Sequence, residues 1–496
     1  MTPPRPLIVV TALLSLVVLA NLWIFARFTV DDAFITWRYG QNLIAHGIWA
    51  YNPDGFDLTQ AYTNPVFAAL SILPAAMGWD MVLSFKLISL LTLAGIGALL
   101  LREAGEKARM AFVLVLSLAI PASIAHAVSG LETWLYGGTL ALFFIYAEQR
   151  KWTQALLCVL LLVLTRPEAW LLFGLYPLML LTTRPARAVV LRHGAALGLM
   201  AAGYFGFHLW YFGEALPNTY FIKSGEGFDP AQALRILPYV LPALALLVWG
   251  NRRTGLALLF YFGAVGYSYA SSDLLMNYLQ RFVFQIVLPM ALYLGWAVSR
   301  APVAQARRGW LTLGVAVYLA AFGLHTRSLG DHLGIANYYP RLLDSHVALG
   351  RALNALSAQG EVASFALGDA GAAAFHADIR ALDTIGLTSH LVAREGLTLA
   401  VVQAYAPDVV AFFATAEGVR DLPDRHAALW AYVAETGMTE QCELVWARQY
   451  TLRLFTRSPL PALSDACAHS AAANDTDELR YALRGLRQPP WTYWHE

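Results

Sequence analysis

Two adjacent carboxylates, Asp31 and Asp32, open the segment DDAFITWRYGQNLIAHG directly after an apolar run. Neighbouring helical residues point about 100° apart, so both acids reach one small site only at an irregular helix end, and we expect them to divide the work. One can act as a general base, because a partly desolvated cleft and the neighbouring charge raise a carboxyl pKa. The other can orient an acceptor hydroxyl or hold a divalent cation. The alternative is structural, with Asp32 capping the helix that follows.

Three cations, Arg166, Lys223 and Arg281, stand beside polar segments at the ends of apolar runs. Together they suit a diphosphate or phosphodiester headgroup. Singly, each can be a snorkelling side chain, and Arg166 can pair with Glu168 in the sequence TRPEAW. Glu132 begins an apolar segment, where the positive end of a helix already favours an acid.

The composition identifies the elements that must position these residues. Hydrophobic residues make up 58% of the 496-residue chain and charged residues only 14%, which indicates a polytopic membrane protein. The net charge of +1 excludes the basic excess of a nucleic-acid binder. The length allows a membrane bundle and a separate soluble domain.

Eleven apolar segments are predicted to cross the membrane. They are residues 7–27, 81–101, 110–127, 132–147, 153–165, 169–182, 193–211, 234–250, 254–270, 278–298 and 309–325. The first lacks a cleavage site and is interpreted as a retained anchor. The short segment 63–78 contains Pro65 and Pro74 and is predicted to lie at the interface.

Positive charge predicts the orientation of these spans. With the first span starting inside, nearly all clustered Lys and Arg of the membrane half fall in the cytoplasm, and counting 63–78 as a span would break this pattern. Both acids, the three cations and everything after about residue 326 then lie on the outer face. We therefore predict a membrane domain over 1–325, with a first outer loop at 28–80, and an extracytoplasmic mixed α/β domain over 326–496.

The C-terminal part has mixed periodicity. Residues 341–358 are predicted to be helical, and 361–368, 408–414 and 450–457 to be strands. GDAG, residues 368–371, is first of all a turn, and the tail from Ser464 is predicted to be loosely held. Cys442 and Cys467 either form a disulfide or remain two thiols.

Several familiar signatures are missing from the chain. There is no P-loop, no HExxH and no zinc-type histidine spacing. Outside the cytoplasm no nucleotide sugar is at hand, so group transfer needs a donor already carried across, usually on a polyprenyl phosphate. Such a donor needs an apolar groove for its tail, cations for its phosphate and a carboxylate base for the acceptor, and the sequence offers all three.

The run DDAFITWRYGQNLIAHGIWAYNPDG followed by AYTNP resembles the first outer loop of GT-C membrane glycosyltransferases, most closely the AftB-type arabinofuranosyltransferase branch. GLET, RPE, GEALPNTYFIK, SSDLLMNYLQRF and GDAGAAAFHADIRALDTIGL match in the same order. Two features depart from the branch: Ser271 and Ser272 replace glycines, and the C-terminal region is shorter.

The resemblance implies that Asp31 and Asp32 are the essential acids. It further implies phosphate-facing roles for Arg38, Arg166, Lys223 and Arg281, and substrate-facing roles for Tyr62, Glu132, Glu168, Asn218 and Asp273. No cofactor is required by the pattern, and a divalent cation, Mg²⁺ or Mn²⁺, is left open.

The predicted function is transfer of a sugar, foremost arabinofuranose, from a polyprenyl phosphate to a glycan or protein hydroxyl on the outer, periplasmic face of the bacterial inner membrane. A mannosyl- or aminoarabinose-type transferase is the alternative among enzymes. A lipid-linked sugar transporter or flippase is the alternative from another class. A transporter would carry ionisable residues near the middle of the bilayer, and Lys86 is the main charged residue well inside a predicted span.

Overall fold

The computed structural model describes residues 5–223, 227–249, 251–274, 276–415, 418–419, 425–447, 449–474 and 477–494. The chain divides into two compact units, a helical unit (1–26, 85–207 and 223–332) and a mixed unit (27–84, 208–222 and 333–496). Residues 28–80, predicted to be the first outer loop of the membrane domain, group here with the C-terminal sheet as part of the segment 27–84.

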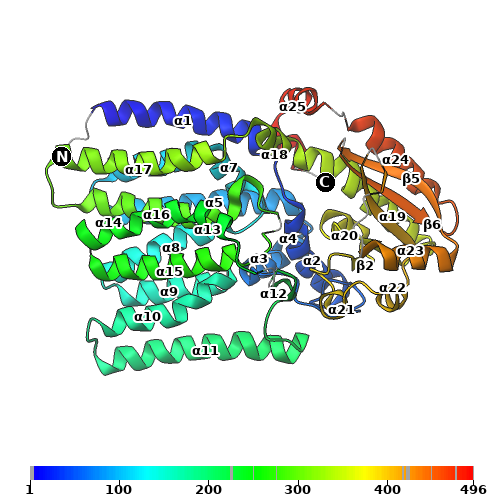
Figure 1. The fold of residues 1–496 in the computed structure, drawn as a ribbon, viewed down its shortest axis with the longest axis horizontal. Coiled ribbons are helices and arrows are strands. Elements are labelled where there is room, and N and C mark those ends of the chain that lie inside the picture. The colour runs from blue at the N-terminus through cyan, green and yellow to red at the C-terminus, as the bar shows by residue number, and fades with distance from the viewer. Residues whose placement is uncertain are drawn as a thin grey trace. The chain divides into compact units, whose positions relative to one another are not determined.

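In the helical unit a helix or a broken helix pair occupies each of the eleven predicted spans, and Figure 1 shows its long helices running side by side. They are α1 (Arg5–Phe25), α5 (Met81–Glu103), α6 (Lys107–Ala119), α7 (Pro121–Val128), α8 (Thr133–Glu148), α9 (Trp152–Val163), η1 (Pro167–Leu171), α10 (Leu172–Leu181), α11 (Arg187–Phe212), α13 (Pro230–Val240), α14 (Pro242–Trp249), α15 (Arg252–Ala270), η2 (Tyr278–Gln280), α16 (Arg281–Arg300) and α17 (Gln305–His325).

Four helices of the described chain are long and apolar enough to cross a membrane alone, or up to six if each of two bent pairs is one span. This number is lower than the predicted eleven because several helices are short. The helices α8, α9 and α10 have 16, 12 and 10 residues, whereas a perpendicular crossing takes about 20. Proline divides others, as at Pro121 between α6 and α7.

Helix α16 forms the centre of the helical unit. In its apolar 18-residue window 89% of the residues are buried, against 6% for α1. A helix that is apolar all round is stable only when it is covered on every side, and α6, α8, α13 and α17 pack against α16. The residue that begins this buried helix, Arg281, is therefore held by a rigid element.

The mixed unit contains a six-stranded sheet in the order β2-β1-β3-β6-β5, with β4 paired to β3. Its strands are β1 (Ser364–Leu367), β2 (Arg380–Asp383), β3 (Val409–Thr415), β4 (Gly418–Val419), β5 (Thr439–Ala447) and β6 (Tyr450–Thr456). The pairs β1–β2 and β1–β3 are parallel, whereas β3–β6 and β6–β5 are antiparallel. The three predicted strands are confirmed as β1, β3 and β6.

Helices cover both faces of this sheet, because successive strand residues point to opposite sides. Phe365 packs with α19, α20 and α24, whereas its neighbour Ala366 packs with α22 and α23. The helices of this unit are α2 (Asp31–His46), α3 (Pro65–Leu70), α4 (Ile72–Met77), α12 (Asn218–Lys223), α18 (Leu329–Leu342), the π-helical turn η3 (Leu343–Val347), α19 (Ala348–Ala358), α20 (Ala372–Ala377), α21 (His390–Glu395), α22 (Leu399–Tyr405), α23 (Arg425–Thr436), α24 (Pro461–Ala473), α25 (Glu478–Leu486) and η4 (Pro490–Tyr493); α12 and α18 each have one end in the helical unit.

The prediction of a loosely held tail was wrong. Helix α24 packs against β5 and α19, and Leu463 and Cys467 are buried in the core of the sheet. The alanine-rich composition that suggested a loose tail is also a strong helix former. A disulfide joins Cys467 to Cys442 of β5, which decides the question left open by the sequence.

Candidate functional site

The two acids lie in the first turn of α2, which Val30 precedes as N-cap residue without any side-chain capping bond. Neither acid caps its own helix, so the capping alternative for Asp32 was wrong. Asp31 instead accepts hydrogen bonds from the backbone N–H groups of Gly371 (3.0 Å, to Oδ2) and Ala372 (2.7 Å, to Oδ1). These amides begin α20, so Asp31 ties two distant segments of the mixed unit together.

Gly371 is required by this close approach. A Cβ atom added there would lie 2.1 Å from the Asp31 carbonyl oxygen and 2.4 Å from its carboxylate. Only a residue without a side chain lets the carboxylate reach both amides. GDAG is therefore more than a turn.

Asp369, in the same GDAG segment, forms a second polar contact. Its Oδ2 lies 2.8 Å from Nε2 of His346, which the π-helical turn η3 presents, and it also accepts a hydrogen bond from the Tyr450 hydroxyl. Burial opposes charge on the imidazole, but the hydrogen bond and charge of Asp369 outweigh it and raise the pKa of His346. The same contact outweighs burial to lower the pKa of Asp369. We assign a charged imidazolium–carboxylate pair.

Asp31 and Asp32 have different environments. Asp31 is only 6% exposed, and burial raises its pKa to about 7, with Asp369 and Asp32 adding to the rise and His346 and the Ala372 amide opposing it. Asp32 is partly exposed, and no hydrogen bond to its carboxylate occurs within the described part of the chain. The carboxylate available to a substrate is therefore that of Asp32.

Aromatic rings surround the His346–Asp369 pair. Trp446 packs edge-on against Tyr338 (5.0 Å between centroids) and Tyr450 (4.7 Å), and lies 5.7 Å from the His346 ring. Its indole Nε1 is buried without a hydrogen-bond partner in the described chain. Rings beside carboxylates suit the apolar face and the hydroxyls of a sugar.

Sequence reasoning did not select His346, Asp369, Gly371, Trp446 or Tyr450. Only GDAG carried a signal, because an acid follows a buried strand there and the segment shares the family resemblance. Gly371 is 340 residues from Asp31 along the chain. Spacing alone therefore cannot connect them.

Three further predicted residues of the mixed unit serve its packing. Arg38 is fully buried, donates from Nη2 to the Ile379 carbonyl at 2.6 Å and stacks 4.5 Å above the Tyr51 ring. Tyr62 accepts a hydrogen bond from the Trp49 indole at 2.9 Å. The amide of Asn218 donates to the carbonyls of residues 386, 387 and 389. Their phosphate and substrate roles remain predictions.

In the helical unit Arg166 is enclosed by two acids. Its Nη1 donates to Glu132 (2.7 Å), and its Nη2 and Nε donate to the two carboxylate oxygens of Glu168 (2.8 and 3.1 Å). Its side chain is 5% exposed. Tyr269 lies 2.8 Å from the same Glu168 oxygen. Arg166 and Glu168 therefore do pair, as the structural alternative held. With its donors so occupied, Arg166 is less suited to bind a phosphate than Arg281.

Arg281 begins the buried helix α16 and is 6% exposed. Its Nε and Nη1 have no hydrogen-bond partner among the residues that the structure describes, and its guanidinium lies over the rings of Tyr278 (5.7 Å) and Phe282 (5.0 Å). Helix N-termini attract anions. A buried guanidinium with free donors at that terminus is suited to hold a phosphate.

The backbone leading into Arg281 is strained. Met276, Leu279 and Gln280 all have positive φ angles, of 57°, 45° and 56°. Such conformations cost about 1–3 kcal/mol each in residues other than glycine and cluster at functional sites. Holding Arg281 in this orientation therefore lowers the stability of the folded chain.

The last two predicted residues, Lys223 and Asp273, lie next to each other in the helical unit. The backbone N–H of Asp273 donates to the Lys223 carbonyl at 3.3 Å, and both side chains are partly exposed. The structure thus joins two predicted loops. No cluster of three or more metal-ligating side chains is found among the described residues.

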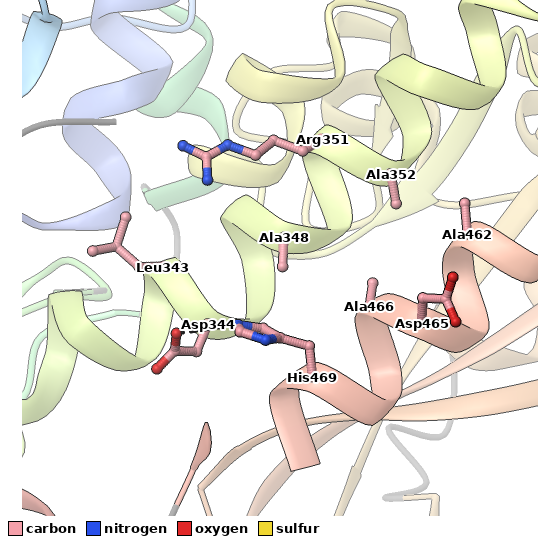
Figure 2. A pocket seen from close by; sticks show the side chains of 9 residues that line it. All are labelled: Leu343, Asp344, Ala348, Arg351, Ala352, Ala462, Asp465, Ala466 and His469. Carbon is pink, nitrogen blue, oxygen red and sulfur yellow. Dashed lines mark hydrogen bonds and ion pairs between the residues drawn. The ribbon is translucent and has the colours of Figure 1, made fainter. Parts of the chain in front are cut away.

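A hollow of about 580 Å³ in the mixed unit contains none of these residues. Alanines of α19 and α24 line it, and Figure 2 shows Asp344 and His469 facing each other at its edge, 3.3 Å apart. The hollow is wide open, and the acids of α2 and GDAG do not line it. We therefore assign the candidate site to these acids and not to the hollow.

Comparisons with known proteins agree with this fold. Residues 336–455 match a family described as a domain of unknown function (DUF8728). No curated protein matches the sequence. The crystal structure of ArnT from Cupriavidus metallidurans, bound to undecaprenyl phosphate, superposes with a TM-score of 0.53 at 14% identity, over 92% of this chain and 99% of that one. The chain therefore has a GT-C fold with a C-terminal mixed-sheet domain.

Proposed function

We propose that this protein is a membrane glycosyltransferase that moves a sugar from a polyprenyl phosphate to an acceptor hydroxyl. The observation that carries the proposal is Arg281, a buried guanidinium at a helix N-terminus whose Nε and Nη1 have no partner among the described residues. The likeness to ArnT, whose structure was determined with undecaprenyl phosphate, supports a lipid phosphate as the ligand of this fold.

In this proposal Arg281 and the N-terminus of α16 bind the phosphate of the donor. They stabilise the negative charge that develops when the bond between the anomeric carbon and the phosphate oxygen breaks. The leaving group departs as polyprenyl phosphate with the bonding electrons. A phosphate leaving group is a weak base, so no general acid is needed.

Asp32 acts as the general base. Its carboxylate removes the proton of the acceptor hydroxyl while the acceptor oxygen forms the new bond to the anomeric carbon. Asp31 is a positioning residue, because its two oxygens are occupied by the amides of Gly371 and Ala372 and hold the start of α2 in place. Trp446, next to His346, offers an apolar surface for a sugar ring.

Arabinofuranose remains the sugar that we propose, on the resemblance of the first outer loop. Mannose and aminoarabinose are the alternatives, and the likeness to ArnT favours neither over arabinofuranose at 14% identity. We place the chemistry on the outer face of the bacterial inner membrane, with a glycan or protein acceptor. The disulfide between Cys442 and Cys467 supports an extracytoplasmic mixed unit.

The test uses purified protein in detergent with arabinofuranosyl, mannosyl and aminoarabinosyl polyprenyl phosphates, cell-envelope acceptors, and added Mg²⁺, Mn²⁺ or chelator. Release of free lipid phosphate is measured for the wild type, Asp32→Asn and Arg281→Ala. Turnover that both variants lose supports the proposal. No turnover with any donor would favour the lipid-linked sugar transporter.

A further inference from the structure

The C-terminal helix α25 has two faces of different chemistry. Tyr481, Ala482 and Gly485 are buried against the mixed unit. The outward face carries Leu479 and Leu483, which are 54% and 53% exposed. Two leucines that are each about half exposed on the same face of a nine-residue helix form an apolar surface, which suits an apolar partner.

Basic side chains flank these leucines. Arg480, Arg484 and Arg487 are exposed, and with Asp477 and the two leucines they line a shallow hollow of about 460 Å³. Three arginines around two leucines match the anionic headgroup and the upper acyl chain of a phospholipid. A soluble acidic protein would satisfy the arginines but not the leucines.

The segment after α25 has the composition of a membrane interface. The sequence PPWTYW follows, with Trp491 52% exposed and the η4 turn holding Tyr493. Tryptophan and tyrosine concentrate at the boundary between headgroups and acyl chains. Aromatic and basic residues therefore occur together in one short stretch.

Contacts within the mixed unit hold this segment against Arg27, which follows a candidate membrane span in the chain. The Arg27 guanidinium lies 5.4 Å from the Tyr493 ring, and a Cβ at Gly485 would lie 2.6 Å from Arg27 Nη1. Arg27 is separated by one residue from Phe25, the last residue of α1, a candidate span.

A second anchor comes from α18, which follows the candidate span α17. Asn337 and Arg341 of α18 bind the Glu478 side chain at 2.8 and 2.7 Å, and Arg341 stacks on Tyr481 at 4.8 Å. Glu478 is in the first turn of α25, so both ends of the segment are fixed.

We infer that α25 and the PPWTYW segment bind the surface of the membrane, with Leu479 and Leu483 in the acyl boundary and the three arginines on anionic lipid headgroups. The mixed unit then has a lipid contact of its own, independent of the transferase activity. Anionic lipids strengthen this contact and raised salt weakens it.

The test uses full-length Leu483→Cys with a fluorophore on the new thiol, reconstituted in nanodiscs of phosphatidylcholine with or without phosphatidylglycerol. Of the native cysteines, Cys158 is buried and the other two form the disulfide, so the label goes to position 483. Gln359→Cys, on an exposed position after α19, is the matched control. Quenching by lipids labelled with nitroxide in the acyl chain reports contact with the bilayer.

We expect strong quenching at 483, none at 359, and a gain with phosphatidylglycerol that is lost in Arg480→Glu/Arg484→Glu/Arg487→Glu. The triple Arg→Lys variant should retain the quenching, which separates loss of charge from loss of fold. Equal quenching at 483 and 359, or a gain with phosphatidylglycerol that persists after charge reversal, would overturn the inference.

Discussion

Replacement of the two adjacent acids by asparagine should give different defects. In Asp31→Asn one carboxylate oxygen becomes an NH₂ group that cannot accept the hydrogen bond now donated by Gly371 or Ala372. A buried N–H left without an acceptor costs about 1–3 kcal/mol of folding stability. Asp32→Asn removes no contact in the described chain, so its stability should change by less than about 0.5 kcal/mol.

The catalytic rates should follow the opposite order. Loss of a general base lowers the rate by roughly 10²–10⁴-fold, or about 3–5 kcal/mol of transition-state stabilisation. Asp32→Asn should show this fall in kcat at nearly wild-type thermal stability. Asp31→Asn should unfold at a lower temperature and lose less activity, because the helix that carries Asp32 is only loosened.

Both variants are measured by release of lipid phosphate and by thermal unfolding in the same detergent, with Gln359→Asn as a surface control. If Asp31→Asn abolishes turnover at unchanged stability while Asp32→Asn stays active, then Asp31 is the base and the assignment from exposure is refuted. If both lose activity equally without unfolding, the acids act as one unit.

Four further predictions concern the neighbouring groups. Arg281→Ala should raise KM for the donor about 10–100-fold, the equivalent of one charged hydrogen bond, whereas Arg300→Ala at the other end of α16 should leave it unchanged. Gly371→Ala should displace the Asp31 carboxylate and lower both stability and turnover, seen by thermal unfolding and the lipid-phosphate assay. Trp446→Leu should raise KM for a sugar substrate with little change in kcat. Because burial raises the pKa of Asp31 to about 7 and that of Asp383 to about 6, the folded state holds protons that the unfolded state loses near pH 4. The unfolding temperature should therefore fall from pH 4 to 7, and Asp31→Asn should reduce this slope.

The sequence predicted local features well. Apolar segments, proline breaks and alternating strands depend on neighbouring residues, and helices or strands form at each of these places. Three strands were missed, among them the two-residue β4. β2 has only four residues, and β5, with Glu440 and Glu443 exposed, lacks a regular apolar alternation and carries two register shifts.

The candidate site was predicted only in part, because residues that contact one another in it lie far apart in the sequence. The side chains of Arg166 and Arg281 look equivalent in sequence. Arg166 is enclosed by Glu132 and Glu168, whereas two nitrogens of Arg281 have no partner within the described part of the chain. That difference depends on the packing of α8 and α15, which no local pattern specifies. Burial and pairing thus separate residues that composition treats alike.

The adjacency of the two acids has a physical reason in the fold. Residues next to each other at a helix start point about 100° apart, so one can face inward while the other faces out. Asp31 faces inward and binds the amides that begin α20, where its burial is tolerated because both oxygens are hydrogen-bonded. This bond fixes the rotation of α2 about its axis, and with it the direction of the Asp32 carboxylate. A single acid could not hold the helix and remain available to a substrate. The general base that we propose at Asp32 therefore depends on the second carboxylate beside it.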